Sequence, residues 1–222
     1  MLTEIQYLIF DLDGTLIDTR EVIAMSLNTA FQKHIGQVFP IIELQKSFGL
    51  SISEIFIKYA KDKARDCEHT YTEEYLTHFT DHARLYPNTL EVLDELIKRG
   101  YQMSIVTSKS RIRTTRELEY FALTSFMDAV VTEDDTTIHK PNPEPILKAL
   151  DLVGRSSFGA VYIGDAPTDI IAGRKAGVLT MAVTWGYHSL EELEKCNPDF
   201  MIMNICDLLN ICVSPNNHYA TL

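Results

Sequence analysis

The chain contains few cysteines, and none of the spacings by which cysteines hold a metal ion. The sequence of 222 residues has four, Cys67, Cys196, Cys206 and Cys212, and no Cys-x-x-Cys pair. A chain of this length buries enough surface to fold without disulfide bonds. We therefore expect neither a structural zinc site nor a disulfide scaffold, and a cytoplasmic, reducing setting.

Long hydrophobic runs and an excess of basic residues are missing as well. No stretch approaches the roughly 20 apolar residues that span a bilayer, and no signal-peptide pattern opens the chain. Lys and Arg number 20 against 31 Asp and Glu, a formal net charge of −11. This charge argues against nucleic-acid binding, which needs a basic face. An anionic substrate would have to be attracted by local positive groups or a metal ion.

The most informative stretch is residues 8–17, Leu-Ile-Phe-Asp-Leu-Asp-Gly-Thr-Leu-Ile, where an apolar run ends at two aspartates. The run 7–10 is too short for a helix and predicts a buried strand. Asp11 then follows the carboxyl end of that strand, where open α/β sheets place their ligand crevice. Gly14 suits a tight loop. One of the two carboxylates can act as a nucleophile and the other in proton transfer, although Asp-x-Asp alone is equally typical of a turn.

Residues 19–85 carry apolar side chains at helical spacing. Helices are predicted at 21–34 and 52–64, with a third capped by Thr72, and no strand is predicted in this region. From residue 86 onward, short apolar strands alternate with helices, which is typical of a parallel sheet. We therefore predict an α/β fold, with a doubly wound Rossmann-like core of residues 1–18 and 86–222 and an inserted helical cap domain of residues 19–85.

Within the predicted core, each strand is followed by a helix. The strands are predicted at 102–107, 129–132, 159–164, 178–184 and 200–203. The helices are predicted at 89–99, 112–121, 143–150, 168–176 and 206–213. Asn142 is expected to cap the helix that begins at Pro143, because both residues are favoured at those positions. The segment after residue 214 is expected to fray.

Polar residues follow the predicted strands at four places: Asp11 with Asp13, Thr107 with Ser108, Lys140, and Asp165 with Asp169. Because the carboxyl ends of parallel strands meet at one edge of a sheet, we expect these side chains to converge. Clustered carboxylates repel one another unless a cation joins them, and oxygen ligands suit Mg²⁺. Such a set predicts phosphoryl transfer. Taken singly, Thr107 and Lys140 would be an ordinary strand residue and a solvated charge.

These residues carry a resemblance to a known family. Asp11-Leu-Asp13-Gly14-Thr15, Thr107, Lys140-Pro141 and the run 164–169, Gly-Asp-Ala-Pro-Thr-Asp, resemble the four motifs of the haloacid dehalogenase-like hydrolase superfamily, in order. The match covers about residues 5–18 and 86–212. By length and helical pattern, the insert resembles the small helical cap of the phosphoglycolate phosphatase-like branch. The chain is also similar to bacterial pyrophosphatases related to the phosphoglycolate enzymes.

The resemblance implies catalytic roles for three residues. Asp11 would be the nucleophile that forms an aspartyl-phosphate. Asp13 would protonate the leaving group and then act as the base for water. Lys140 would balance charge between Asp11 and the phosphoryl group.

The resemblance also implies a substrate site and a metal site. Thr107 would hydrogen-bond the phosphoryl oxygens together with Ser108, Lys140 and the loop at Gly14. Mg²⁺ would be held by Asp165, by Asp11, and by Asp13 through its backbone carbonyl, and Asp169 would hold the surroundings of the metal in place.

We therefore predict a Mg²⁺-dependent phosphatase that hydrolyses a small phosphomonoester such as phosphoglycolate. Alternatives in the same superfamily are an inorganic pyrophosphatase, a phosphosugar mutase, or a phosphonate hydrolase if Lys46, Lys58 or Lys61 formed a Schiff base. A phospho-accepting signalling module, from another class, also uses an acidic cluster, a hydroxyl and a lysine, but it lacks an inserted cap. The expected partner is a small phosphorylated substrate, and the sequence leaves the oligomeric state open.

Three further features have simpler predicted roles. The acidic segment Glu133-Asp134-Asp135 is expected to be a solvated turn. Trp185 and Tyr187 are expected to pack in the core rather than contact substrate. Residues 46–51 are expected to form a cap loop near the active site, with Lys46 solvated.

Overall fold

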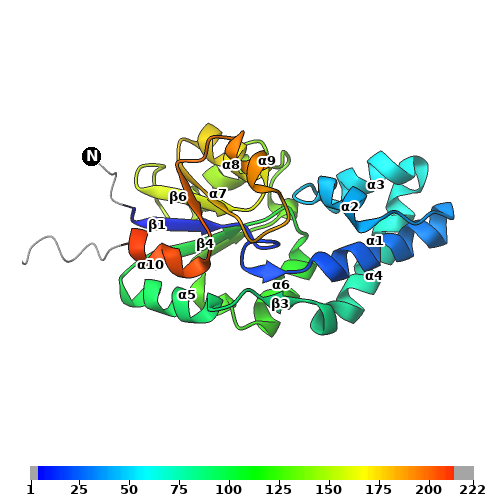
Figure 1. The fold of residues 1–222 in the computed structure, drawn as a ribbon, viewed down its shortest axis with the longest axis horizontal. Coiled ribbons are helices and arrows are strands. Elements are labelled where there is room, and N and C mark those ends of the chain that lie inside the picture. The colour runs from blue at the N-terminus through cyan, green and yellow to red at the C-terminus, as the bar shows by residue number, and fades with distance from the viewer. Residues whose placement is uncertain (1–4, 213–222) are drawn as a thin grey trace, which may run out of the picture.

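The computed structural model describes residues 5–212, in which an α/β core carries a helical unit at one end (Figure 1). Six parallel strands form the central sheet in the order β5-β4-β1-β6-β7-β8. Their bounds are β1 Tyr7–Phe10, β4 Gln102–Val106, β5 Ala129–Val131, β6 Ala160–Gly164, β7 Leu179–Val183 and β8 Phe200–Ile202. The strand order reverses direction between β1 and β6, where doubly wound sheets bind their ligands. The predicted α/β fold is confirmed.

Strand β1 is buried on both faces, because its side chains alternate between two hydrophobic layers. Leu8 and Phe10 pack in one layer, and Tyr7 and Ile9 in the other. Burial of each such side chain contributes about 1.5–3 kcal/mol. Together they hold the end of β1 rigidly at the centre of the sheet.

Helices cover both faces of this sheet (Figure 1). The first layer lies under α5 (Thr89–Lys98), α6 (Arg111–Tyr120) and α10 (Leu208–Ile211). The second layer lies under α7 (Glu144–Leu152) and α8 (Pro167–Ala176), and α9 (Leu190–Glu194) packs beside α8.

The predicted core helices differ from the structure by one or two residues at their ends, and two of these differences have a local cause. Helix α7 begins at Glu144 rather than Pro143, although the Asn142 side chain still accepts the Glu144 N–H at 3.0 Å. The last predicted helix is shorter, because a 3₁₀ turn at Ile205–Asp207 precedes α10. The predicted fraying after residue 214 lies outside the described residues.

The helical unit contains α1 (Arg20–Ile35), α2 (Ile41–Leu44), α3 (Ile52–Ala60) and α4 (Ala64–His82). The prediction that Thr72 caps a helix is wrong. Its hydroxyl donates to the Glu68 carbonyl at 2.9 Å inside α4, because the buried stripe of that helix extends upstream to Cys67 and Tyr71. Helix α3 ends before residue 64, since Lys61 has a positive φ of 52°.

A short two-stranded ribbon connects the core to the helical unit. Strands β2 (Ile17–Asp18) and β3 (Arg84–Leu85) pair antiparallel. The sequence analysis predicted neither of these strands, because two-residue strands are too short to show a period-two pattern. The ribbon lies at the predicted boundaries of the cap domain, near residues 18 and 86, which we keep as proposed boundaries.

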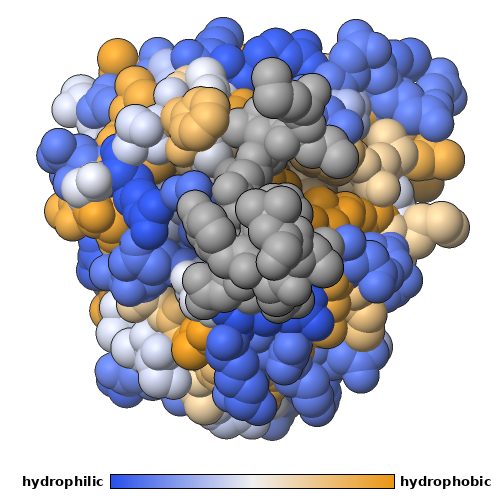
Figure 2. All heavy atoms as spheres, turned by 90° about the vertical axis from the view of Figure 1, so that its left-hand side faces the viewer, coloured by the Kyte–Doolittle hydropathy of each residue, from blue (hydrophilic) through white to orange (hydrophobic). Residues whose placement is uncertain are grey.

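Within residues 5–212, no helix has both the length and the apolar character to cross a bilayer. Figure 2 shows the end of the core opposite the helical unit, where hydrophilic and hydrophobic side chains are interspersed.

Candidate active site

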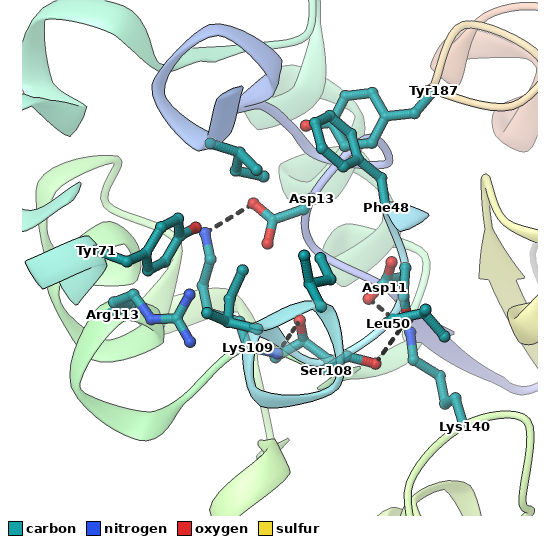
Figure 3. A pocket seen from close by; sticks show the side chains of 15 residues that line it. Asp11, Asp13, Phe48, Leu50, Tyr71, Ser108, Lys109, Arg113, Lys140 and Tyr187 are labelled. Atoms are coloured by element: carbon teal, nitrogen blue, oxygen red, sulfur yellow. Dashed lines mark hydrogen bonds and ion pairs between the residues drawn. The ribbon is translucent and has the colours of Figure 1, made fainter. Parts of the chain in front are cut away.

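A small pocket of about 40 Å³ lies between the carboxyl ends of the strands and the helical unit (Figure 3). Five predicted site residues line it: Asp11, Asp13, Thr107, Ser108 and Lys140. The helical unit contributes mostly apolar side chains, including Ile23 and Ile55. The sequence therefore predicted part of the polar wall of this pocket, and the fold adds Lys109, Arg113 and an apolar wall.

Lys140 joins two of the predicted carboxylates. Its Nζ lies 3.0 Å from Asp11 Oδ1 and 2.6 Å from Asp169 Oδ1, and the residue is 2% exposed. Burial raises the pKa of Asp11 well above its ordinary range, although Lys140 opposes this shift. Burial disfavours the charge on Lys140, but Asp11 and Asp169 together hold its pKa well above the ordinary value. Lys140 is a buried cation of the site, not a solvated loop charge.

Three buried carboxylates at this point could hold a metal ion. One oxygen from each of Asp11, Asp165 and Asp169 lies within 4.8 Å of the others. Burial, and then the charge of Asp169, raise the pKa of Asp165 to about 7. With Lys140 protonated, the ionised group would carry two uncompensated negative charges, which a divalent cation would neutralise. The oxygen donors and this charge fit Mg²⁺.

Two glycines let the backbone approach Asp165 closely. A Cβ on Gly14, which has a φ of +80°, would lie 2.3 Å from Asp165 Oδ2, and one on Gly186 would lie 2.2 Å from Asp165 Cβ. Gly14 is not among the residues that line the pocket. Because Gly14 has no side chain, it leaves room for the Asp165 carboxylate. The sequence reasoning missed Gly186, which follows β7 far from the motifs.

Asp13 is held by two donors at one oxygen. Its Oδ1 accepts from Thr19 Oγ1 at 2.5 Å and from Lys109 Nζ at 2.7 Å. In the part of the chain that the structure describes, no residue donates to Oδ2. The arrangement leaves Oδ2 available for proton transfer to a bound molecule.

Lys109 belongs to a buried network that the sequence reasoning missed. Its Nζ donates to both carboxylate oxygens of Glu117 at 2.6 Å and to the Tyr75 hydroxyl at 2.8 Å. Tyr75 also donates to Glu117. Burial raises the pKa of Glu117, and Lys109 opposes the shift. The available signal was the position of Lys109, two residues after Thr107, with Glu117 on the next helix.

Tyr187 packs against the hydrophobic core, as predicted, but it also lines the pocket, which was not expected. Its hydroxyl accepts the Thr19 N–H at 2.9 Å, and its own N–H donates to Asp165 Oδ2 at 2.7 Å. Its ring meets Phe48 of the helical unit edge-on, with the centroids 5.2 Å apart. Trp185 donates to the Thr15 carbonyl at 3.1 Å. Tyr187 thus links Asp165, Thr19 at the start of the helical unit, and Phe48.

The loop predicted to face the site does so through Phe48, Gly49 and Leu50, which line the pocket. Ser108 Oγ donates to the Gly49 carbonyl at 3.1 Å and so contacts the helical unit. The three cap lysines are exposed and do not line the pocket: Lys46, Lys58 and Lys61. A Schiff base from one of them has no support in this geometry.

The prediction that the acidic turn 133–135 is solvated is wrong for Glu133. The Glu133 side chain is 11% exposed, and its Oε1 lies 3.2 Å from Nη2 of Arg113, which is 2% exposed. The prediction failed because Arg113, on the neighbouring helix α6, folds back onto this turn. Arg113 also lines the pocket.

A family model and a curated relative both match most of this chain. Residues 8–183 match the family model described as haloacid dehalogenase-like hydrolase. Pyrophosphatase PpaX of Bacillus cereus strain AH820 is 35% identical over 213 residues, covering 96% of this chain and 99% of that protein.

Solved structures have the same fold. A Bacteroides fragilis structure, described as haloacid dehalogenase-like, superposes with a TM-score of 0.86 at 25% identity, covering 92% of this chain and 100% of that one. A predicted phosphoglycolate phosphatase from Haemophilus somnus has a TM-score of 0.83 at 23% identity, covering 96% and 100%. At that identity the second likeness concerns the fold alone.

Proposed function

Because the chain belongs to the haloacid dehalogenase-like hydrolase family, as its motifs predicted, we propose that it is a Mg²⁺-dependent hydrolase of inorganic pyrophosphate. The Bacillus cereus relative, named a pyrophosphatase, supports this substrate with 35% identity over 96% of this chain. The relatives thus favour the alternative substrate over the phosphomonoester that the sequence analysis put first. The chemistry rests on one observation: Lys140 joins Asp11 to a buried carboxylate group that fits a divalent cation.

Asp11 is the proposed nucleophile. Its carboxylate attacks one phosphorus of pyrophosphate, the bridging P–O bond breaks, and an aspartyl-phosphate forms while phosphate leaves. Asp13 Oδ2 gives its proton to that leaving oxygen. In the second step Asp13 takes a proton from water, the water oxygen attacks phosphorus, and the bond to Asp11 breaks. The placement of Asp13 by Lys109 and Thr19 supports this assignment.

Lys140, Thr107 and Ser108 are proposed to bind the transferring phosphoryl group. The Thr107 hydroxyl accepts the Lys109 N–H at 3.2 Å, so its own proton remains to donate to a phosphoryl oxygen. Lys140 offers a buried positive charge beside Asp11. The attraction between such a charge and a phosphoryl oxygen is stronger in a site with low-dielectric walls than in water.

Asp11 and Asp165, with the backbone carbonyl of Asp13, are the proposed metal ligands. When bound, Mg²⁺ would neutralise charge on the phosphoryl oxygens. Both oxygens of Asp169 are engaged, Oδ1 by Lys140 at 2.6 Å and Oδ2 by the Ala166 N–H at 3.0 Å. This engagement favours a role in positioning its neighbours.

The second candidate substrate is phosphoglycolate, which the resemblance to the phosphoglycolate phosphatase-like branch supports. The two candidates are separated by measuring phosphate release from each, side by side, with Mg²⁺ and with a chelator. We expect faster, chelator-sensitive release from pyrophosphate. Faster release from phosphoglycolate would overturn the proposed substrate and leave the proposed chemistry standing.

The nucleophile is tested with Asp11→Asn, which should abolish turnover and leave the fold intact. Asp62→Asn, at an exposed position in the helical unit, is the matched control and should retain activity. Wild-type turnover by Asp11→Asn would contradict the covalent mechanism. If the wild-type protein instead retained one phosphate on Asp11 and did not turn over, it would be a signalling module.

A further inference from the structure

We propose that Arg113 and Tyr71 form a second anion subsite, which binds the part of the substrate that leaves. Its ligand is the second phosphate of pyrophosphate or, for phosphoglycolate, the carboxylate. Figure 3 shows Arg113 and Tyr71 on one side of the pocket, and Asp11 and Lys140 on the opposite side. The inference rests on the proposed function, because it requires that the phosphoryl group is transferred to Asp11.

Arg113 is the least neutralised of the three cations that line the pocket. Lys140 is paired with Asp11 and Asp169, at 3.0 and 2.6 Å. Lys109 is also paired with two carboxylates, at 2.7 and 2.6 Å. Arg113 is paired with one carboxylate, at the longer distance of 3.2 Å. The positive charge of Arg113 is therefore the least compensated by protein carboxylates, and it can attract an anionic ligand.

The neighbours of Arg113 orient its guanidinium. Nε donates to Ser110 Oγ at 2.8 Å, and the group lies 5.1 Å from the centre of the Tyr71 ring. Burial raises the pKa of its partner Glu133 to about 7, against the opposing effect of Arg113, so the charge of Glu133 is incomplete at neutral pH. A planar guanidinium fixed in this way suits a phosphate or carboxylate, which it can bind through two N–H groups.

Tyr71 has a donor without a hydrogen-bond acceptor. The residue is fully buried and lines the pocket, and its hydroxyl has no acceptor among the described residues. A buried polar group without a partner destabilises the protein. An anion beside Arg113 would accept this O–H and remove the destabilisation. Because α4 supplies Tyr71 and α6 supplies Arg113, the subsite is complete only when the helical unit packs on the core.

Apolar walls from the helical unit strengthen the subsite. Ile23, Ile52 and Ile55 line the same pocket as Arg113, and their side chains offer no hydrogen bond to water or to a ligand. In such surroundings an ion pair is stronger than in water, and a substrate without a second anion leaves Arg113 poorly compensated. The subsite would therefore select substrates with two anionic ends.

The test compares pyrophosphate with ethyl phosphate, which has a phosphoryl group but no second anion. In Arg113→Met, the ratio of kcat/KM for pyrophosphate to that for ethyl phosphate should fall about 10- to 100-fold, the value of a hydrogen-bonded ion pair. Tyr71→Phe should also lower the ratio, by about 10-fold or more, because a hydrogen bond to an anion is charge-assisted. Arg116→Met, at an exposed position on the same helix, should leave the ratio unchanged. Equal losses on both substrates would overturn the proposal.

Two further measurements separate this inference from the proposed function. If pyrophosphate is not a substrate, the same ratio is taken for phosphoglycolate against ethyl phosphate. Calorimetry with methylenediphosphonate and methylphosphonate, in the presence of Mg²⁺, needs no turnover. We expect the wild type to bind the diphosphonate at least 10-fold more tightly, and Arg113→Met and Tyr71→Phe to reduce this preference. Equal binding of the two phosphonates by the wild type would overturn the subsite.

Discussion

Lys109 Nζ lies 2.7 Å from Oδ1 of Asp13 and bridges this carboxylate to Glu117, on helix α6. Tyr75 of α4 contacts the same ammonium at 2.8 Å. The proposed acid of the reaction is therefore held by a lysine that is itself held from both the core and the helical unit. This relationship makes the placement of Asp13 depend on how the helical unit packs.

Removal of Lys109 should destabilise the protein strongly. Lys109→Met leaves two carboxylates beside each other without their cation, and loss of one partner of a buried pair costs about 3–5 kcal/mol. Adding Glu117→Gln should recover part of the free energy of unfolding, measured by urea denaturation. Lys98→Met removes an ion pair whose lysine side chain is 65% exposed, and it should leave stability almost unchanged. A double variant no more stable than Lys109→Met would contradict the network.

Asp13→Asn should slow the reaction according to the leaving group. General acid catalysis contributes about 10²- to 10⁴-fold, and this loss is expected for alkyl phosphates, whose leaving groups are poor. The loss should be smallest for nitrophenyl phosphate, whose leaving group needs no proton. Steady-state kinetics on the two substrates provides the comparison. Equal losses would count against Asp13 as the acid.

Metal binding should stabilise the folded protein independently of activity. At 100 times its dissociation constant, Mg²⁺ should raise the free energy of unfolding by about 2.7 kcal/mol, measured by denaturation with Mg²⁺ and with a chelator. Asp165→Asn should weaken this response. Gly186→Ala should weaken it as well, because its methyl group would lie 2.2 Å from Asp165 Cβ.

Gly154→Ala is the control for the glycine variant, since a Cβ there meets no atom within 4 Å. Its φ is +65°, so alanine should cost some stability while the Mg²⁺ response stays normal. An unchanged Mg²⁺ response in both Asp165→Asn and Gly186→Ala would argue against the assigned metal site.

Glu133 should make stability depend on pH. Burial raises its pKa from 4.5 to about 7, so between these values the folded state binds more protons than the unfolded state. The free energy of unfolding then falls as pH rises through this window. Glu133→Gln removes this contribution, so urea denaturation at about pH 5 and pH 7.5 should show a smaller decrease for the variant than for the wild type. Parallel decreases would indicate that Glu133 has an ordinary pKa in the folded protein.

The sequence by itself determined the sheet and part of the polar wall of the site. The apolar run before Asp11 and the alternation of strands and helices after residue 86 are local patterns. They predict a parallel sheet, and such a sheet brings the ends of its strands together. Asp11, Thr107, Lys140 and Asp165 were therefore predictable, because each directly follows a strand or its loop.

Only the tertiary structure decided which side chains from separate elements touch. The contacts of Lys109 with Tyr75, of Arg113 with Tyr71, and of Gly186 with Asp165 join segments far apart in the chain. No local period encodes such contacts. The first two depend on how the helical unit packs across the connecting ribbon, and the third depends on how the loops after β6 and β7 meet. The same holds for that ribbon, whose two-residue strands exist because they pair with each other. Hydrophobic periodicity predicts which face of an element is buried, whereas packing selects the partner that covers it.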